Sequence, residues 1–574
     1  MTAGAVSWKP GFFRDHTWPQ MSIMAIMLVV VGVMTLYPLG MIIFGSLRSS
    51  MPGEPGYFTL DGYRQFLSDP GILMALWNSF AIAGVRTLIS MILAVFFCWV
   101  IVRTDTPLKG PLEFMLWLNF FLPALPMTMG WILLLDPHYG FINKLFLKLP
   151  FLKESPFNIY SYSGIIWSHM AFSTSVRFLM FTPAFRNMDA ALEESARMSG
   201  ASNLKTLVRI TFPLMIPAVL ATTMLGFIRA MESFEIELLL GMPAKIFVYA
   251  TKVFDLLRWE PPQYPPAMAL STIFMVIIFF MVFIQHRVTK RRQYTTITGK
   301  GYRVNPTSLG RWKYVTLGIC LLYIAIFTLL PLTFLVIGTF MKIAGMFELP
   351  DPFTLHHWQT ILGDPLFFRS LINSMLMACG AAFVGMIFYS IISYITIRTK
   401  LPGRGLLGFM SWLPWSVPGL LLAVGLLWVF LGNPILVPLY GTLYVLIIAM
   451  IIKEMSMGVR VMDGSMIQIG NELEEAARSS GASWFYTFRH IIAPLLRPTF
   501  LATAVLIFLI SIREISVVVM LYSAKCKVLS ILMLEYYQGR SPEEGMAMGL
   551  IIVFIALIVA AVMRFIFGMR LATR

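Results

Sequence analysis

The 574-residue sequence is poor in charged residues. Only 13% of its residues are Asp, Glu, Lys or Arg, whereas ordinary soluble domains contain about 25%. Hydrophobic residues make up 58%, which is enough for twelve segments of about 20 residues, the length that crosses a hydrocarbon core. The composition therefore excludes a soluble enzyme and predicts an all-α polytopic membrane protein.

The sequence also has few side chains that form disulfides or bind metals. Of its four cysteines, three lie inside apolar runs and Cys526 stands alone in a polar loop, so no spacing indicates a disulfide framework or a zinc site. Among the seven histidines, only His356 and His357 are adjacent, and no paired-histidine metal motif occurs. We therefore expect no metal site and no cofactor bound by this chain.

Twelve apolar runs are long enough to be membrane spans. Those of the first set lie near 21–46, 73–102, 112–135, 160–182, 214–240 and 266–285. Those of the second set lie near 314–340, 367–397, 406–431, 437–461, 499–522 and 546–568. The run at 21–46 is too long for the apolar region of a signal peptide, so we interpret it as the first span.

A basic segment separates the two sets of runs. Between Gln285 and Lys313 the sequence holds eight Lys or Arg residues and no acidic residue. Such residues concentrate in cytoplasmic loops, so we attribute the net charge of +16 to membrane topology and not to a nucleic-acid surface. This predicts a first half at 1–285, a cytoplasmic linker at 286–313 and a second half at 314–574, with both termini in the cytoplasm.

Two segments far apart in the sequence match each other. Residues 194–200 read Glu-Ser-Ala-Arg-Met-Ser-Gly, and residues 475–481 read Glu-Ala-Ala-Arg-Ser-Ser-Gly. The displacement is 281 residues, as from Gly200 to Gly481. A second register, displaced by 295 residues, relates Asn-Ser at 78–79 to 373–374 and Arg-Thr at 103–104 to 398–399. We infer a tandem duplication whose six-span halves are related by a pseudo-twofold axis along the membrane normal.

Each repeated segment is predicted to form two short helices separated by a glycine. An acidic first helix is expected at 191–199, ending at Gly200 where a positive φ costs little, and Ser202 is placed to cap a second helix at 204–210. Gly481 and Ser483 hold the same places in the second copy. A single copy would fit a plain inter-helix connection equally well. Two copies on one face instead suggest a partner that is itself twofold.

Each copy resembles the EAA loop of binding-protein-dependent ABC importer permeases, with Glu-x-Ala, three residues, Gly, nine residues and Ile-x-x-Pro. The likeness covers nearly the whole chain, with five-helix permease cores near 73–285 and 367–568. The residues that it implicates in coupling to an ATPase are Glu194, Ala196, Gly200, Ile210 and Pro213 in the first copy, and Glu475, Ala476, Ala477, Gly481, Ile491 and Pro494 in the second.

The resemblance also implies the partners. In that family each loop is a coupling helix seated in a cleft of a separate ATP-binding subunit. Two copies of that subunit are therefore expected, carrying the ATP and Mg, together with a solute-binding protein that delivers the cargo to a bacterial inner-membrane permease. The copies depart from the family pattern at Ser195, Phe212 and Ala493, which leaves open whether the two ATPase contacts are equally strong.

A weaker likeness concerns the solute. The run Glu-Ser-Phe-Glu at 232–235 and the run Arg-Glu-Ile-Ser at 513–516 are similar to those of ferric-iron importer permeases. Related permeases for phosphonate, thiamine, polyamines and oxyanions share much of this pattern. The resemblance therefore implies ferric iron first, with those solutes as alternatives.

Ionisable residues inside predicted spans are functional candidates, because they are costly in lipid. Glu232 and Glu235 fall in the predicted fifth span, and Arg513 and Glu514 in the eleventh. The 281-residue register makes Glu232 and Arg513 equivalent positions of opposite charge. We predict that they form part of an outer gate, with Glu235 and Glu514 as further candidates for the gate or the translocation path. Side chains reaching to the outer interface, or a fixed ion pair, explain the pattern equally well.

The chain is not expected to be an enzyme. No Gly-x4-Gly-Lys-Ser/Thr phosphate loop occurs in the sequence, so energy must come from a partner or from an ion gradient. An ion-coupled secondary transporter with two six-span halves is therefore the rival class. It lacks support at 103–107, where the Gly-x-x-x-Asp-Arg loop of the commonest twelve-span carriers is absent. A membrane-embedded enzyme would need clustered nucleophiles, bases or metal ligands, which the sequence does not show.

Overall fold

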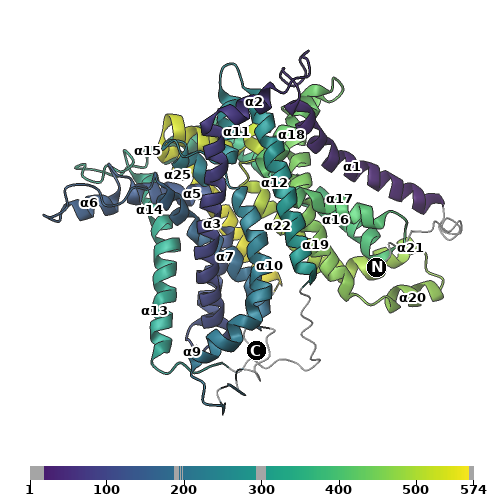
Figure 1. Cartoon of the computed structure of the whole chain (residues 1–574), viewed down its shortest axis with the longest axis horizontal. Helices are drawn as coiled ribbons and strands as arrows, with labels where there is room; N and C mark the ends of the chain where they lie inside the picture. Colours follow the sequence, from purple (N-terminus) through teal and green to yellow (C-terminus); the bar gives the residue numbers. More distant parts are fainter. Residues whose placement is uncertain (1–17, 187–192, 194, 197, 292–305, 568–574) are drawn as a thin grey trace.

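The computed structural model describes residues 18–186, 193, 195–196, 198–291 and 306–567. Over these residues the chain is built of helices, and β-structure is limited to three isolated bridges. Figure 1 shows long helices running between an upper end, where α2 and α15 lie, and a lower end, where α9 and α20 lie. The all-α fold predicted from the composition is confirmed.

The helices of the two halves follow one another in nearly the same order. Those of the first half are α1 (Trp18–Ser46), α2 (Asp61–Ser68), α3 (Pro70–Cys98), η1 (Trp99–Arg103), α4 (Lys109–Phe121), α5 (Ala124–Leu135), α6 (Phe141–Leu147), α7 (Tyr162–Arg186), α9 (Asn203–Thr206), η2 (Leu207–Thr211), α10 (Phe212–Met231), η3 (Glu237–Gly241), α11 (Tyr249–Arg258) and α12 (Tyr264–Arg291).

The second half begins after the linker. Its helices are α13 (Trp312–Ile324), η4 (Ala325–Leu329), α14 (Leu330–Phe340), α15 (His356–Gly363), α16 (Pro365–Arg398), α17 (Arg404–Trp412), η5 (Leu413–Ser416), α18 (Gly419–Gly432), η6 (Val437–Leu439), α19 (Leu443–Gln468), α20 (Glu472–Ser479), α21 (Trp484–Thr487), η7 (Phe488–Ile492), α22 (Ala493–Ile512), α23 (Val518–Leu521), α24 (Leu529–Glu535), η8 (Tyr536–Arg540) and α25 (Pro542–Phe567).

Seven helices within the described residues are long and apolar enough to cross a membrane, or nine if each of two bent pairs counts as one span. The bent pairs are α4 with α5, at 102°, and α17–η5 with α18, at 112°. Pro123 and Pro418 stand at the two breaks. Proline lacks the N–H that would continue the helix, so each helix is interrupted there. The count of twelve spans remains a prediction.

Two predicted spans extend past the ends of their helices. The fifth was expected to reach 240, but α10 ends at Met231, and the eleventh was expected to reach 522, but α22 ends at Ile512. Glu232 and Arg513 are the residues that follow these ends. Both residues therefore lie just past the end of a helix and not inside an unbroken helix reaching 240 or 522.

Each half sends its first long helix across to the other half. α1 packs against α17 and α18, and α14 packs against α5. A Cβ on Gly130 of α5 would lie 2.0 Å from the carbonyl oxygen of Pro331. Likewise, a Cβ on Gly425 of α18 would lie 2.6 Å from the carbonyl oxygen of Pro38 in α1. Glycine is thus required at both crossings for the backbones to approach, and the halves interlock through equivalent contacts.

The first helix of each predicted permease core is held in the same way. The side chains of Asp69 and Asp364 cap α3 and α16, and a proline follows each. One serine in each of these helices then bonds to a short helix that comes later in the same half, near the upper end. Ser79 Oγ accepts a hydrogen bond from the first N–H of α11, and Ser374 Oγ accepts one from the first N–H of α24, both at 2.7 Å. These repeated contacts agree with a duplicated chain.

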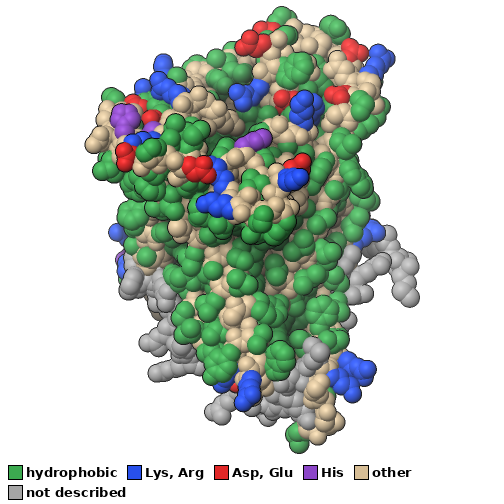
Figure 2. Space-filling view, turned by 90° about the vertical axis from the view of Figure 1, so that its left-hand side faces the viewer, with side chains coloured by type: hydrophobic (Ala, Val, Ile, Leu, Met, Phe, Trp, Pro, Cys, Tyr) green, Lys and Arg blue, Asp and Glu red, His purple; other side chains and the backbone are tan. Residues whose placement is uncertain are grey.

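Figure 2 shows how charge is distributed over one face of the molecule. A broad apolar band covers its middle, a mixture of acidic and basic side chains lies above the band, and Lys and Arg side chains lie at its lower edge. Apolar surface of this extent fits contact with lipid. The face is therefore that of a membrane protein with a basic lower end.

Candidate functional site: the repeated loops and the buried charges

The two repeated loops lie at the same end of the molecule. The first follows α7 and leads through α9 into α10, and the second follows α19 and leads through α20 and α21 into α22. In Figure 1, α9 and α20 both lie in the lower part, away from α2 and α15. The structure therefore brings the two loop motifs to one side of the bundle.

A left-handed glycine makes the turn in each loop. Gly200 has φ +83° and Gly481 has φ +79°. Directly after them, the N–H of Ala201 donates to the carbonyl of Ala196, and the N–H of Ala482 to that of Ala477, both at 3.0 Å. This hydrogen bond belongs to the Schellman motif that ends many helices. The glycine turn predicted for both copies is confirmed.

The helices after these turns begin as predicted but do not end as predicted. Ser202 Oγ and Ser483 Oγ each accept a main-chain N–H three residues later, at 3.3 Å. The helix then continues through the π-turns η2 and η7 into the next long helix instead of stopping at the proline. Pro213 and Pro494 are the second residues of α10 and α22. The wider π-turn precedes a residue that has no N–H to donate.

The predicted coupling residues differ in exposure. In α20, Glu475 and Ala476 are exposed and Ala477 is buried, so the helix shows one face to solvent and another to the bundle. Ile210 and Ile491 are half-buried, and Ile491 packs against a small core around Met466. In the first copy, Ala196 is half-buried. Glu194 lies outside the described residues, as do residues 191, 192 and 197 of the predicted helix at 191–199.

The proposed gate residues are not paired with each other. Glu232 Oε2 lies 3.0 Å from Nη1 of Arg229, and the Arg229 guanidinium lies 4.1 Å from the ring centre of Trp415. Arg513 instead donates to the carbonyl oxygens of Phe120 and Leu122. The structure thus does not form the Glu232–Arg513 ion pair that the register suggested, because each residue has a nearer partner.

These arginine contacts are reciprocal between the halves. Arg513 lies over the ring of Phe120 at the break between α4 and α5, and Arg229 lies over Trp415 at the break between α17 and α18. Phe120 and Trp415 are equivalent in the 295-residue register. A bent helix leaves carbonyl groups without helical partners, and Arg513 supplies donors to two of them. Each half thereby covers the broken helix of the other.

A second group of charges joins α19 to the segment after α22. Lys453 Nζ lies 2.6 Å from Oε2 of Glu514, whose other oxygen accepts hydrogen bonds from Ser516 Oγ and the N–H of Val517. Nearby electrostatic partners include Glu235 and Glu454. Glu514 is therefore neutralised by a lysine that the sequence-based analysis did not select.

The first half has a buried network of its own. His169 Nε2 lies 2.9 Å from Oε1 of Glu237, and Ser233 Oγ donates to the other oxygen at 2.6 Å. Arg86 donates to the carbonyl of Ala230 at 2.9 Å. Neither repeat register nor motif pointed to His169, Arg86, Arg229, Lys453 or Glu454. Their position inside predicted apolar runs was the signal that would have found them.

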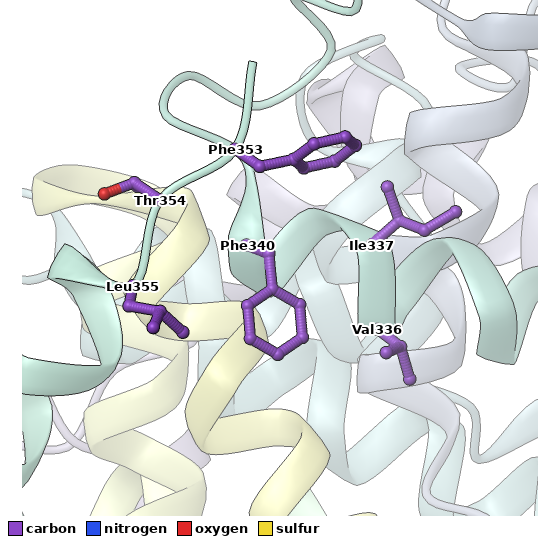
Figure 3. Close-up of a pocket in the computed structure, with 6 residues that line it drawn as sticks. All are labelled: Val336, Ile337, Phe340, Phe353, Thr354 and Leu355. Atoms are coloured by element: carbon purple, nitrogen blue, oxygen red, sulfur yellow. The ribbon is translucent and has the colours of Figure 1, made fainter. Parts of the chain in front are cut away.

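The hollows on the outer surface of α14 are apolar. One has a volume of about 570 Å³ and is shown in Figure 3. Its lining residues are Val336, Ile337, Phe340, Phe353, Thr354 and Leu355. None of these lining residues is charged. Within the described residues, no three His, Cys, Asp or Glu side chains gather into a metal-ligating group.

Comparison with known proteins gives the class of the molecule. Residues 387–569 match the family described as the binding-protein-dependent transport system inner membrane component. A probable ABC transporter permease protein of Sinorhizobium fredii is 27% identical over 497 residues, which cover 85% of each chain. The chain is thus similar to permeases of the binding-protein-dependent ABC importer class, most directly over residues 387–569.

Two further relatives are named for ferric transport. The ferric transport system permease protein FbpB of Actinobacillus pleuropneumoniae is 26% identical over 405 residues, covering 70% of this chain and 58% of that protein. A putative ferric transport system permease protein of Haemophilus influenzae is 26% identical over 394 residues, covering 68% of this chain and 61% of that protein. The chain thus spans about three fifths of the length of these two relatives.

Proposed function

We propose that this chain is the permease subunit of an ATP-driven importer that moves ferric iron, delivered by a solute-binding protein, into the cytoplasm. The observation that carries the proposal is the pair of loops with the same glycine turn and serine cap, at one end of the molecule. The two relatives named for ferric transport support iron as the cargo. Phosphonate, thiamine, a polyamine or an oxyanion are the alternative cargoes.

The partners follow from the loops. Two copies of an ATP-binding subunit, which hold the ATP and Mg, would each receive one loop through Gly200 or Gly481 and the residues around them. This places the basic linker 286–313 and both termini in the cytoplasm, which agrees with the Lys and Arg side chains at the lower edge in Figure 2. The units are then the halves 1–285 and 314–574, with cores near 73–285 and 367–568.

Transport would proceed by alternating access. As the ATPase subunits close and open, one half would rock against the other, and the interlocked crossings of α1 and α14 would keep the halves together. The charges that follow the ends of α10 and α22 lie beside the bent helices, at the contact between the two halves. They include Glu232, Glu235, Arg513 and Glu514. They would form the outer gate.

Deletion of a loop tests this function. The complete transporter, reconstituted in proteoliposomes with its ATP-binding subunit and binding protein, is expected to accumulate ferric iron only when ATP is supplied. Removing residues 472–479, which form α20, should abolish uptake, because one ATPase contact is lost. Uptake that survives this deletion and follows an imposed ion gradient would instead indicate the secondary transporter. Transport of another solute, without iron, would replace the cargo but keep the class.

A further inference from the structure

In each half, one contact joins a residue matched by the 295-residue register to a residue matched by the 281-residue register. Arg103, the last residue of η1, places Nη2 2.6 Å from Oε2 of Glu193. Arg398, the last residue of α16, places Nε 3.8 Å from Oε1 of Glu474 in α20. The arginines are related by 295 residues and the glutamates by 281. An arginine–glutamate pair thus joins the end of a core helix to the loop in both copies, hydrogen-bonded in the first half and longer in the second.

Both contacts are buried. The side chains of Arg103 and Glu193 are 0% and 3% exposed, and those of Arg398 and Glu474 are 4% and 9% exposed. A charge removed from water to this extent persists only beside a partner. The planar guanidinium is suited to such a place because it donates to several acceptors at once. Each pair therefore fixes the loop against the core helix more firmly than an exposed pair would.

Each pair also reaches a third element. In the first half, the other oxygen of Glu193 accepts a hydrogen bond from Thr211 Oγ1 at 2.7 Å, at the end of η2. In the second half, Arg398 donates to the carbonyl oxygens of Met466 and Ile469, at 2.6 and 2.5 Å, where α19 ends. The contact is thus a junction between the core helix, the loop and a helix that flanks the loop.

The opposite face of the loop helix is free for a partner. Among the described side chains of α20, Glu474 and Ala477 are buried, whereas Glu475 and Ala476 are exposed. Residues three apart share one face of a helix, so Glu474 and Ala477 form the inner face. A partner seated on the exposed face would push or pull α20 against the Arg398–Glu474 contact.

We propose that the pairs Arg103–Glu193 and Arg398–Glu474 carry the movement of each loop to α3 and α16, and so couple ATP hydrolysis to the opening of the permease. The four residues are positioning residues, since they act through the loops and not on the solute or the nucleotide. The proposal rests on the proposed docking of ATPase subunits at the loops.

The first junction has an additional brace. The N–H of Thr307, in the linker, donates to the carbonyl of Arg103 at 2.8 Å, and the N–H of Leu309 donates to Asp105 Oδ1 at 2.9 Å. Within the described residues, no β-bridge of this kind reaches residues 398–400. The pair of the first half is also the closer one, at 2.6 Å against 3.8 Å, so breaking it should disturb coupling more than breaking that of the second.

Charge reversal tests the proposal in the purified complex of permease and ATP-binding subunit, in proteoliposomes with the binding protein. The quantity to measure is solute transported per ATP hydrolysed. Arg398→Glu and Glu474→Arg should each lower this ratio at least fivefold in complexes that still contain the ATP-binding subunit. The double variant should recover at least half of the ratio. The corresponding variants of Arg103 and Glu193 should show a larger loss.

The control is an ion pair that does not touch a loop turn. Arg186 Nη2 lies 2.6 Å from Oε1 of Glu113, which is 1% exposed, and joins α7 to α4. Arg186→Gln breaks a pair of the same length and should lower the yield of assembled complex without changing the transport ratio. A role in stability alone would make the loop variants behave like this control.

A covalent link provides a second measurement that does not depend on charge. Arg398→Cys with Glu474→Cys should uncouple transport, and a bifunctional thiol reagent as long as the lost side chains should restore it. Single reversals with the wild-type ratio, a double reversal no better than the singles, or a cross-linked pair that stays uncoupled would overturn the proposal. If the wild-type complex shows no ATP-dependent transport at all, the proposed function fails instead.

Discussion

Gly200 and Gly481 hold a backbone conformation that other residues rarely adopt. Their φ angles are +83° and +79°, and a Cβ on either would meet no atom within 4 Å. A side chain would therefore be disfavoured by the backbone alone, at a cost of about 1–2 kcal/mol. Since 1 kcal/mol changes a population about fivefold, Gly200→Ala or Gly481→Ala should reduce ATP-driven uptake about fivefold. Asparagine at either position should be less harmful, because it tolerates this conformation.

A helical glycine offers a matched control. A Cβ on Gly464, within α19, would also meet no atom within 4 Å, and this residue has no positive φ. Gly464→Ala should leave uptake unchanged or raise the stability of α19, because alanine is the better helix former. Equal losses for Gly464→Ala and Gly481→Ala would show that the turn has no special role.

At this scale the sequence predicted what short-range chemistry determines. The glycine turns and the serine caps depend on neighbours within a few residues, so the local pattern was sufficient. The partners of Glu232 and Arg513 could not be predicted in the same way. Arg513 contacts the carbonyl of Phe120, 393 residues away, and such a contact depends on how the halves pack.

The long helices also have some features that the sequence predicted and others that it did not. Apolar length predicted the helices that are long enough to cross a membrane, seven among the described residues or nine with the bent pairs, because burial in lipid demands about 20 apolar residues. Apolar length did not predict that two spans bend by 102° and 112°. It also did not predict where α10 and α22 end. Those ends occur at Glu232 and Arg513, and Arg513 finds its partners on the opposite half. Mean hydropathy alone does not record where such partners lie.

The helix ends that carry the proposed gate yield a second prediction. Glu232→Arg would set a second positive charge beside Arg229 and remove the partner of that arginine. Arg513→Glu would remove the donors to the carbonyls of Phe120 and Leu122. Each single variant should lower iron uptake in proteoliposomes at least fivefold. Two singles with wild-type uptake would remove Glu232 and Arg513 from the gate.

The double variant tells which conformations the gate visits. Glu232 and Arg513 have separate partners in this structure, so the exchange Glu232→Arg/Arg513→Glu should not restore uptake if the structure represents every state. Recovery in the double variant would indicate another state of the cycle in which the two residues meet.

At the scale of the whole molecule, the two halves interlock and are joined by a linker. α1 lies against the second half and α14 against the first, so neither half is complete without the other. The linker adds a local attachment through Thr307 and Leu309, which bond to Arg103 and Asp105. The Leu309 N–H also lowers the pKa of Asp105, so this attachment favours the charged carboxylate and weakens only when acid protonates it.

A divided chain separates the contributions of connection and attachment. Fragments 1–299 and 300–574, expressed together, should assemble and transport, because the crossings of α1 and α14 and the attachment at 306–311 are all retained. Fragments 1–299 and 312–574 lack only that attachment. They should still assemble, but with uptake at least threefold lower, since the turn at Arg103 that holds the first loop loses its brace. Co-purification and ATP-driven uptake measure the two effects. Equal uptake by both pairs would show that residues 306–311 merely connect the halves, whereas failure of both pairs to assemble would contradict the interlocked arrangement.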